Sequence, residues 1–95
     1  MIYQLDGGVI LYSETAKAGK DQIEFKARET CFLVGQPQSG GRVNLQIQRC
    51  DKMPWGMTKI AVERSAVVMT HDVTDQSILA SIKSELSGLI IPITN

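Results

Sequence analysis

The chain has 95 residues, 43% of them hydrophobic, and its ten basic and ten acidic side chains cancel at neutral pH. This length predicts one domain over residues 1–95, and the cancelled charge excludes a protein that binds nucleic acid mainly through bulk positive charge, although it is compatible with a local patch. No apolar run approaches the length of a membrane span, and the first residues lack the charged and apolar blocks of a signal peptide, so we expect no membrane partner.

Strands are predicted over most of residues 2–71. The tight-turn signal Asp6-Gly7-Gly8 joins strands at 2–5 and 9–14 and predicts an N-terminal β-hairpin. A strand at 23–28 follows, and Glu29 then interrupts the alternation of apolar and polar residues, which indicates a bend.

A second hairpin is predicted from strands at 30–34 and 42–48, joined by a loop at 35–41 that contains three glycines and one proline. The second strand alternates strictly, with Val43, Leu45 and Ile47 on one face. The other face carries a guanidinium and three amides, from Arg42, Asn44, Gln46 and Gln48. These groups can bind bases or phosphates through hydrogen bonds, and the alternative is an ordinary half-solvated strand.

An irregular loop at 49–57 follows this hairpin. Within it, Trp55 either folds back over an open edge of the core or meets another subunit. Of the two cysteines, Cys31 lies in an apolar strand and is expected in the core, whereas Cys50 lies in this loop and is a candidate for exposure.

A long strand at 58–71 is predicted next, and then a single amphipathic helix at about 75–88. Its apolar residues recur at helical spacing, namely Ile78, Leu79, Ile82, Leu86 and Leu89. A helix of this length spans about 21 Å and cannot cover a sheet of about six strands. We therefore expect an α+β fold with an N-terminal β-hairpin, an antiparallel sheet and one C-terminal helix, completed as an intertwined homodimer in which each helix covers a shared sheet.

Catalysis is not expected from this sequence. His71 is the only histidine, the carboxylates are dispersed, and neither glycine pair precedes a helix. Metal-ligand spacings are absent as well. We expect no enzyme, no cofactor, no metal and no small-molecule substrate.

The order of these elements resembles the coat proteins of the small single-stranded RNA bacteriophages, the leviviruses. The pieces that carry the resemblance are the Asp6-Gly7-Gly8 hairpin, the Thr30-Cys31 strand, Arg42-Val43-Asn44-Leu45, and His71-Asp72-Val73-Thr74 before the helix. The chain is shorter than members of that family and lacks their second C-terminal helix. The resemblance implies a structural capsid protein, made in the cytoplasm of a bacterial host and located in the virion. Its dimers would assemble into an icosahedral shell around single-stranded viral RNA, and they could also bind an RNA hairpin as translational repressor and packaging signal.

Carried over by position, the resemblance implies an RNA-binding face and an inter-subunit loop. The face would present Thr30, Phe32, Val34, Arg42, Asn44, Gln46 and Gln48, with Glu63 and Ser65 as further candidates. Arg42 would contact phosphate, and Asn44 and Gln46 would contact base or sugar, while Cys31, Leu33, Val43, Leu45 and Ile47 would pack under the helices. The loop would meet neighbouring subunits through Cys50, Met53, Pro54 and Trp55, and Cys50 could form disulfides between subunits after release. The competing hypothesis is a small dimeric cellular module that binds RNA or protein through its sheet.

Overall fold

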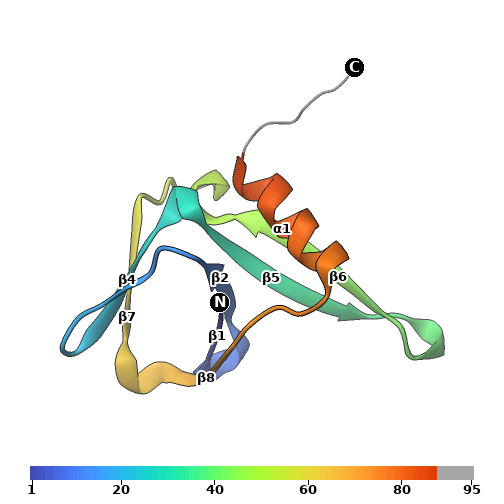
Figure 1. Cartoon of the computed structure of the whole chain (residues 1–95), viewed down its shortest axis with the longest axis horizontal. Coiled ribbons are helices and arrows are strands. Elements are labelled where there is room, and N and C mark those ends of the chain that lie inside the picture. Colours follow the sequence, from blue (N-terminus) through green and yellow to red (C-terminus); the bar gives the residue numbers. More distant parts are fainter. Residues whose placement is uncertain (88–95) are drawn as a thin grey trace.

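The computed structural model describes residues 1–87, which form eight strands and one helix (Figure 1). The elements are β1 (Ile2–Leu5), β2 (Ile10–Ser13), β3 (Lys17–Ala18), β4 (Gln22–Lys26), β5 (Thr30–Pro37), β6 (Val43–Arg49), β7 (Lys59–Glu63), β8 (Val67–His71) and α1 (Gln76–Ser87). All strand pairs are antiparallel, so the α+β class with a C-terminal helix is confirmed, with more strands than the expected six.

The strands belong to two sheets that join into a ring. The larger sheet has the order β6-β5-β2-β1-β8, and the smaller has the order β3-β4-β7. The 3₁₀ turn Ala27–Glu29 bends β4 into β5, and the turn Arg64–Ala66 bends β7 into β8. Because β4 also pairs with β7, these two bent segments close the sheets into a small barrel (Figure 1).

The bend at Glu29 agrees with the interrupted alternation, but the prediction of one long strand at 58–71 is wrong. The turn Arg64–Ala66 divides that segment between the two sheets. A straight strand could not pair with β4 at one end and β1 at the other, because strands in the two sheets run in different directions.

The barrel interior forms one hydrophobic core. Its buried members are Leu11, Ile23, Phe25, Ala27 and Cys50. The rings of Tyr3 and Phe25 meet edge to face, with their centroids 5.0 Å apart and their planes at 86°.

A second core lies outside the barrel, between α1 and the outer face of the larger sheet. Ile82 is completely buried there, and the partly buried Ile78, Leu79 and Leu86 lie beside it, as the helical spacing predicted. The sheet contributes the buried side chains of Ile2, Tyr12, Cys31 and Leu33, with Leu45 and Ile47 partly buried.

The start of α1 is capped by Asp75. Its Oδ1 accepts hydrogen bonds from the hydroxyl of Ser77 at 2.7 Å and from the backbone N–H groups of Ser77 at 3.0 Å and Ile78 at 3.2 Å. These bonds, that of the Ser77 hydroxyl most of all, hold the pKa of the carboxyl below its usual value. The predicted helix end at Gly88 and the apolar Leu89 lie outside the described residues.

These two cores change the argument for a dimer. Barrel closure covers one face of the larger sheet, and α1 of the same chain covers the outer face of β5 and β6. The sheet therefore does not need a second subunit's helix to cover it. The intertwined homodimer stays a prediction from the resemblance alone.

The strands β5 and β6 continue past the barrel wall as a hairpin, which we call the arm and define as residues 33–47. The strand β2 pairs with β5 only as far as Phe32, whereas β5 and β6 stay paired out to Pro37 and Val43. The predicted loop at 35–41 is thus shortened to a tight tip. There Gln38 N donates to Arg42 O at 2.7 Å, and Gly40 and Gly41 take positive φ angles of 83° and 78°.

We predict that Ile82→Ala lowers the free energy of unfolding by about 2–5 kcal/mol, because it leaves a cavity in the fully buried centre of the outer core. Urea denaturation followed by circular dichroism measures this change. Ser81→Ala, at the adjacent exposed position, is the matched control and should alter stability by less than about 0.5 kcal/mol. Equal effects of the two changes would show that α1 is not docked on the sheet.

Candidate binding surface

The face of β5 and β6 opposite α1, which we call the front face, gathers most of the predicted ligand-contacting residues. Three cross-strand pairs form it, namely Phe32 with Gln48, Val34 with Gln46, and Gln36 with Asn44. Directly paired residues of an antiparallel ladder project to the same side. The front face therefore carries four carboxamides beside one aromatic and one aliphatic side chain.

Gln36 is a member of this face that the sequence analysis missed. The predicted strand stopped at residue 34, because the glycines and the proline that follow indicated a loop. Continuing the strand's alternation by one more step, from Phe32 and Val34 to Gln36, would have found it.

Trp55 lies next to the front face. It lines a groove of about 350 Å³ together with Phe32, Val34, Met53, Gln46 and Gln48. The Trp55 side chain is 69% exposed, so the interpretation that it plugs the core is wrong. Its loop closes on itself, with Gly56 N donating to Met53 O at 3.0 Å, and this turn holds the indole outside the core.

The groove is lined by apolar and aromatic side chains together with the amides of Gln46 and Gln48. Residues 30–48 contain no acidic side chain, and their single charged residue is Arg42. Arg42 is exposed at the arm's tip, beside a shallow hollow that Gln38, Ser39 and Asn44 also line. A ligand on the front face would therefore meet hydrogen-bonding groups and π surface, with positive charge at one end.

Three predicted RNA-facing residues do not join this surface. Thr30 is completely buried, and its hydroxyl donates to Lys26 O at 2.8 Å. Glu63 pairs with Gln22 in the smaller sheet, and Ser65 lies in the turn that divides β7 from β8. The prediction for Thr30 is wrong because barrel closure covers that end of β5. The other two are separated from the front face by the division of the long strand.

The expectation that Cys50 is exposed is also wrong, whereas the burial of Cys31 is confirmed. Both thiols are free and have no accessible surface, and burial raises the pKa of each to about 12. Cys50 starts the short turn Cys50–Lys52, which brings its side chain into the barrel interior. An inter-subunit disulfide through Cys50 would require this part of the core to open.

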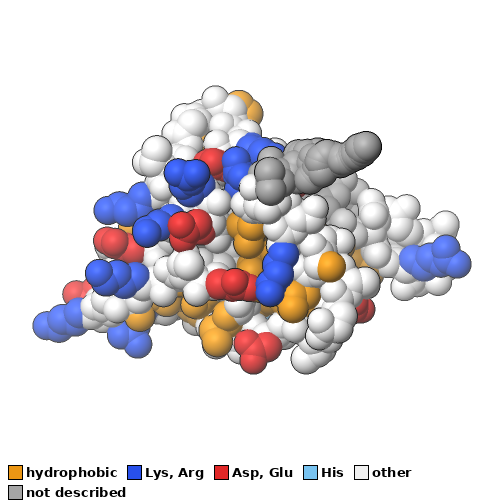
Figure 2. Space-filling model, turned by 45° about the horizontal axis from the view of Figure 1, so that its top comes forward, with side chains coloured by type: hydrophobic (Ala, Val, Ile, Leu, Met, Phe, Trp, Pro, Cys, Tyr) orange, Lys and Arg blue, Asp and Glu red, His pale blue; other side chains and the backbone are white. Residues whose placement is uncertain are grey.

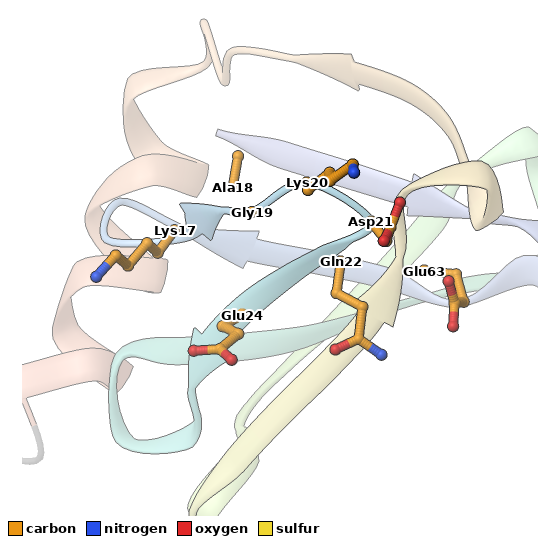
Figure 3. A pocket seen from close by; sticks show the side chains of 8 residues that line it. All are labelled: Lys17, Ala18, Gly19, Lys20, Asp21, Gln22, Glu24 and Glu63. Carbon is orange, nitrogen blue, oxygen red and sulfur yellow. The ribbon is translucent and has the colours of Figure 1, made fainter.

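A larger hollow of about 780 Å³ lies between β3, β4 and the end of β7 (Figure 3). Its charged side chains have both signs and point in different directions, as the sticks for Lys17, Glu24 and Glu63 show. Arg64 holds the adjacent turn, since its Nη1 donates to Gly19 O at 3.1 Å and its backbone N donates to Asp21 O at 2.9 Å. The hollow brings no acid and base together at one point.

The remaining surface offers little chemistry of its own. Figure 2 shows acidic and basic side chains interspersed on one side of the molecule, without a field of one sign. Within residues 1–87, no group of three or more His, Cys, Asp or Glu could hold a metal ion, and no helix is long and apolar enough to cross a membrane. His71 is exposed, and its Nε2 lies 3.0 Å from Gln4 Nε2.

Fold and site together define a small antiparallel barrel with a projecting arm, backed by one helix and with an uncharged front face. Comparisons with protein-family models, with curated proteins and with solved structures found no match.

We predict that neither thiol of the folded protein reacts with a disulfide reagent at pH 8, and that both react once urea unfolds the chain. The pKa values near 12 also predict that the contribution of the two thiols to stability is constant up to about pH 8 and falls as pH rises from there toward 12, because the thiols of the unfolded chain lose their protons first. Thiol counting against urea concentration tests the first point, and unfolding curves from pH 8 to 11 test the second. Rapid labelling of one thiol in the folded state would contradict the burial of both cysteines.

Proposed function

We propose that this protein is a non-catalytic module that binds single-stranded RNA on the front face of its arm. The observation that carries the proposal is the front face of an acid-free hairpin, where four carboxamides lie beside Phe32, together with Trp55 of the neighbouring loop. Proteins that read single-stranded RNA combine aromatic surfaces, on which bases stack, with side chains that bond to base edges.

The carboxamides suit base edges because each has both a donor and an acceptor group. Gln46 and Gln48 are exposed along β6, and their backbone is held in a paired strand. Their side chains can therefore meet the donor and acceptor atoms of an unpaired base without a change in the backbone.

The aromatic groups supply stacking. Both Trp55, which is exposed, and Phe32, which is half-buried, line the groove. One stacked base contributes about 1–3 kcal/mol to binding. The groove of about 350 Å³ has room for one base, so neighbouring nucleotides would extend along the arm.

Charge has a smaller role in this proposal. Arg42 at the tip is the group placed to meet a phosphate, and the neutral chain adds no general attraction for RNA. Binding would therefore be weak for one copy and only mildly dependent on salt. Several copies acting on one RNA would raise the overall affinity.

We predict that Gln46→Leu weakens binding of a labelled 12-nucleotide RNA about fivefold or more, because a base-edge partner is lost while the strand is kept. Fluorescence anisotropy measures the affinity, and quenching of Trp55, the only tryptophan, reports contact with the groove. Gln22→Leu, on the exposed face of β4, is the matched control and should bind like the parent protein. No binding by the parent protein, or equal loss in both variants, would contradict the proposal.

Arg42→Ala gives a second measure of the same site. We expect it to flatten the dependence of log affinity on log salt by about 0.7, the value for one phosphate contact with a single strand. Arg28→Ala, exposed in the turn Ala27–Glu29, is the control and should leave the slope unchanged.

A second candidate function is the capsid assembly that the levivirus resemblance implies. The observation in its favour is the apolar loop of Met53, Pro54 and Trp55, which projects an indole that is 69% exposed. Exposed apolar groups of this kind often meet another subunit.

If the chain is a coat protein, its expression alone should give particles tens of nanometres across that contain nuclease-protected RNA. Negative-stain microscopy tests this directly. We then expect Trp55→Ser to reduce the particles, whereas Val68→Ser, at an equally exposed site on β8, should not. A monomer or simple dimer at high concentration would exclude this candidate and leave RNA binding by the arm to be judged separately.

A further inference from the structure

The outer edge of β6 is open in the part of the chain that the structure describes. β6 ends the five-stranded sheet, and no strand within residues 1–87 pairs with its far side. Edge strands commonly carry a lysine, a proline or a bulge that prevents pairing with another strand. β6 has none of these, and its only charge is Arg49 at the last position.

Two hydrogen bonds show which backbone groups of β6 point to this edge. Gln38 N donates to Arg42 O at 2.7 Å, so the backbone carbonyl of Arg42, just before β6, points toward β5. By alternation, the backbone polar groups of Asn44, Gln46 and Gln48 also point toward β5. Arg49 N donates instead to Glu85 Oε2 of α1 at 3.2 Å. Because these directions alternate along a strand, the N–H and C=O groups of Val43, Leu45 and Ile47 point to the open edge.

The chain leaves α1 beside one end of this edge. Arg49 Nη1 donates to Leu86 O at 3.5 Å, so the last turn of the helix lies at the C-terminal end of β6. Residues 88–95 follow, outside the described part, with the sequence Gly88-Leu89-Ile90-Ile91-Pro92-Ile93-Thr94-Asn95. In extended form these residues would span about 26 Å, enough to follow the seven residues of β6.

We propose that residues 89–93 add to the outer edge of β6 as an antiparallel strand of the same chain. In the register that we assign, Leu89 lies opposite Ile47, Ile91 opposite Leu45, and Ile93 opposite Val43. In this register the strand begins two residues after the end of α1, at the C-terminal end of β6, near which the last turn of the helix lies.

The side-chain pattern fits the same register. Val43, Leu45 and Ile47 form an apolar row on the α1 side of β6, with Val43 67% exposed. Leu89, Ile91 and Ile93 alternate at the spacing of one strand face, so the proposed strand would extend this row. Burial of these side chains is the driving force of the docking.

Pro92 fits as well. It would lie opposite Asn44, at a position whose backbone nitrogen turns away from β6 and needs no ladder bond. On the new outer edge the missing N–H at Pro92 would weaken any further pairing. The chain's own tail is favoured over a second copy because its starting point already lies at the edge, which gives it a high effective concentration.

Amide hydrogen exchange followed by NMR tests this proposal on the full chain and on a chain that ends at Ser87. The amides of Val43, Leu45 and Ile47 should exchange at least about tenfold faster in the shortened chain. The amides of Asn44, Gln46 and Gln48 turn toward β5, and they should keep their rates and so report an intact fold. Equal rates for the first three amides in the two chains would overturn the proposal.

Two point variants test the register without shortening the chain. Ile91→Asp places a charge in the apolar row and should speed exchange of the outward amides as the deletion does, whereas Thr94→Asp should leave the amides of Leu45 and Ile47 protected. Equal effects of the two variants would overturn the register. Protection that increases between two protein concentrations tenfold apart would mean that a second copy supplies the strand, and would overturn docking within one chain.

Discussion

Burial of both faces of β5 at the barrel wall is the constraint on which the rest of the structure depends. Thr30 is buried on the barrel side of this strand, and Cys31 and Leu33 are buried on the α1 side. A strand that is apolar on both faces needs two covers. The closed barrel provides one and the single helix provides the other, which is why one short helix is enough for this chain.

The same constraint explains where a ligand could bind. The barrel wall ends at Phe32, the last residue of β5 that pairs with β2, but α1 still covers the outer face at the base of the arm, over Leu33, Leu45 and Ile47. The base of the arm is therefore supported by α1 on one face and open on the other. Its exposed groups lie on paired strands, so a ligand would meet a surface that is already ordered.

Recognition on such a surface depends on placed groups more than on net charge. Acidic and basic side chains are mixed over the face shown in Figure 2, whereas residues 30–48 have no acid and one base. Hydrogen bonds from amides and stacking on Trp55 are short-range interactions, so they select for shape and donor pattern. A chain whose charges cancel exerts little long-range electrostatic attraction on a charged ligand, so the rate of encounter is not increased by charge.

Local patterns in the sequence were enough to predict the elements themselves. The alternation in β6, the spacing of Ile78, Ile82 and Leu86, and the burial of Cys31 each depend on residues close together in the chain, and each is confirmed. An apolar repeat of two residues in a strand, or of 3.6 residues in a helix, shows which side chains share a face. It does not show which other element covers that face.

Tertiary structure alone decided the rest. Barrel closure broke the segment at 58–71 at the turn Arg64–Ala66, buried Thr30 and Cys50, and removed the need for a partner's helix. Pairing across the arm brought Gln36 onto the front face, and the closed loop left Trp55 in solvent. The physical reason is the same in each case, since burial depends on contacts between elements that are far apart in sequence, and no local period records them.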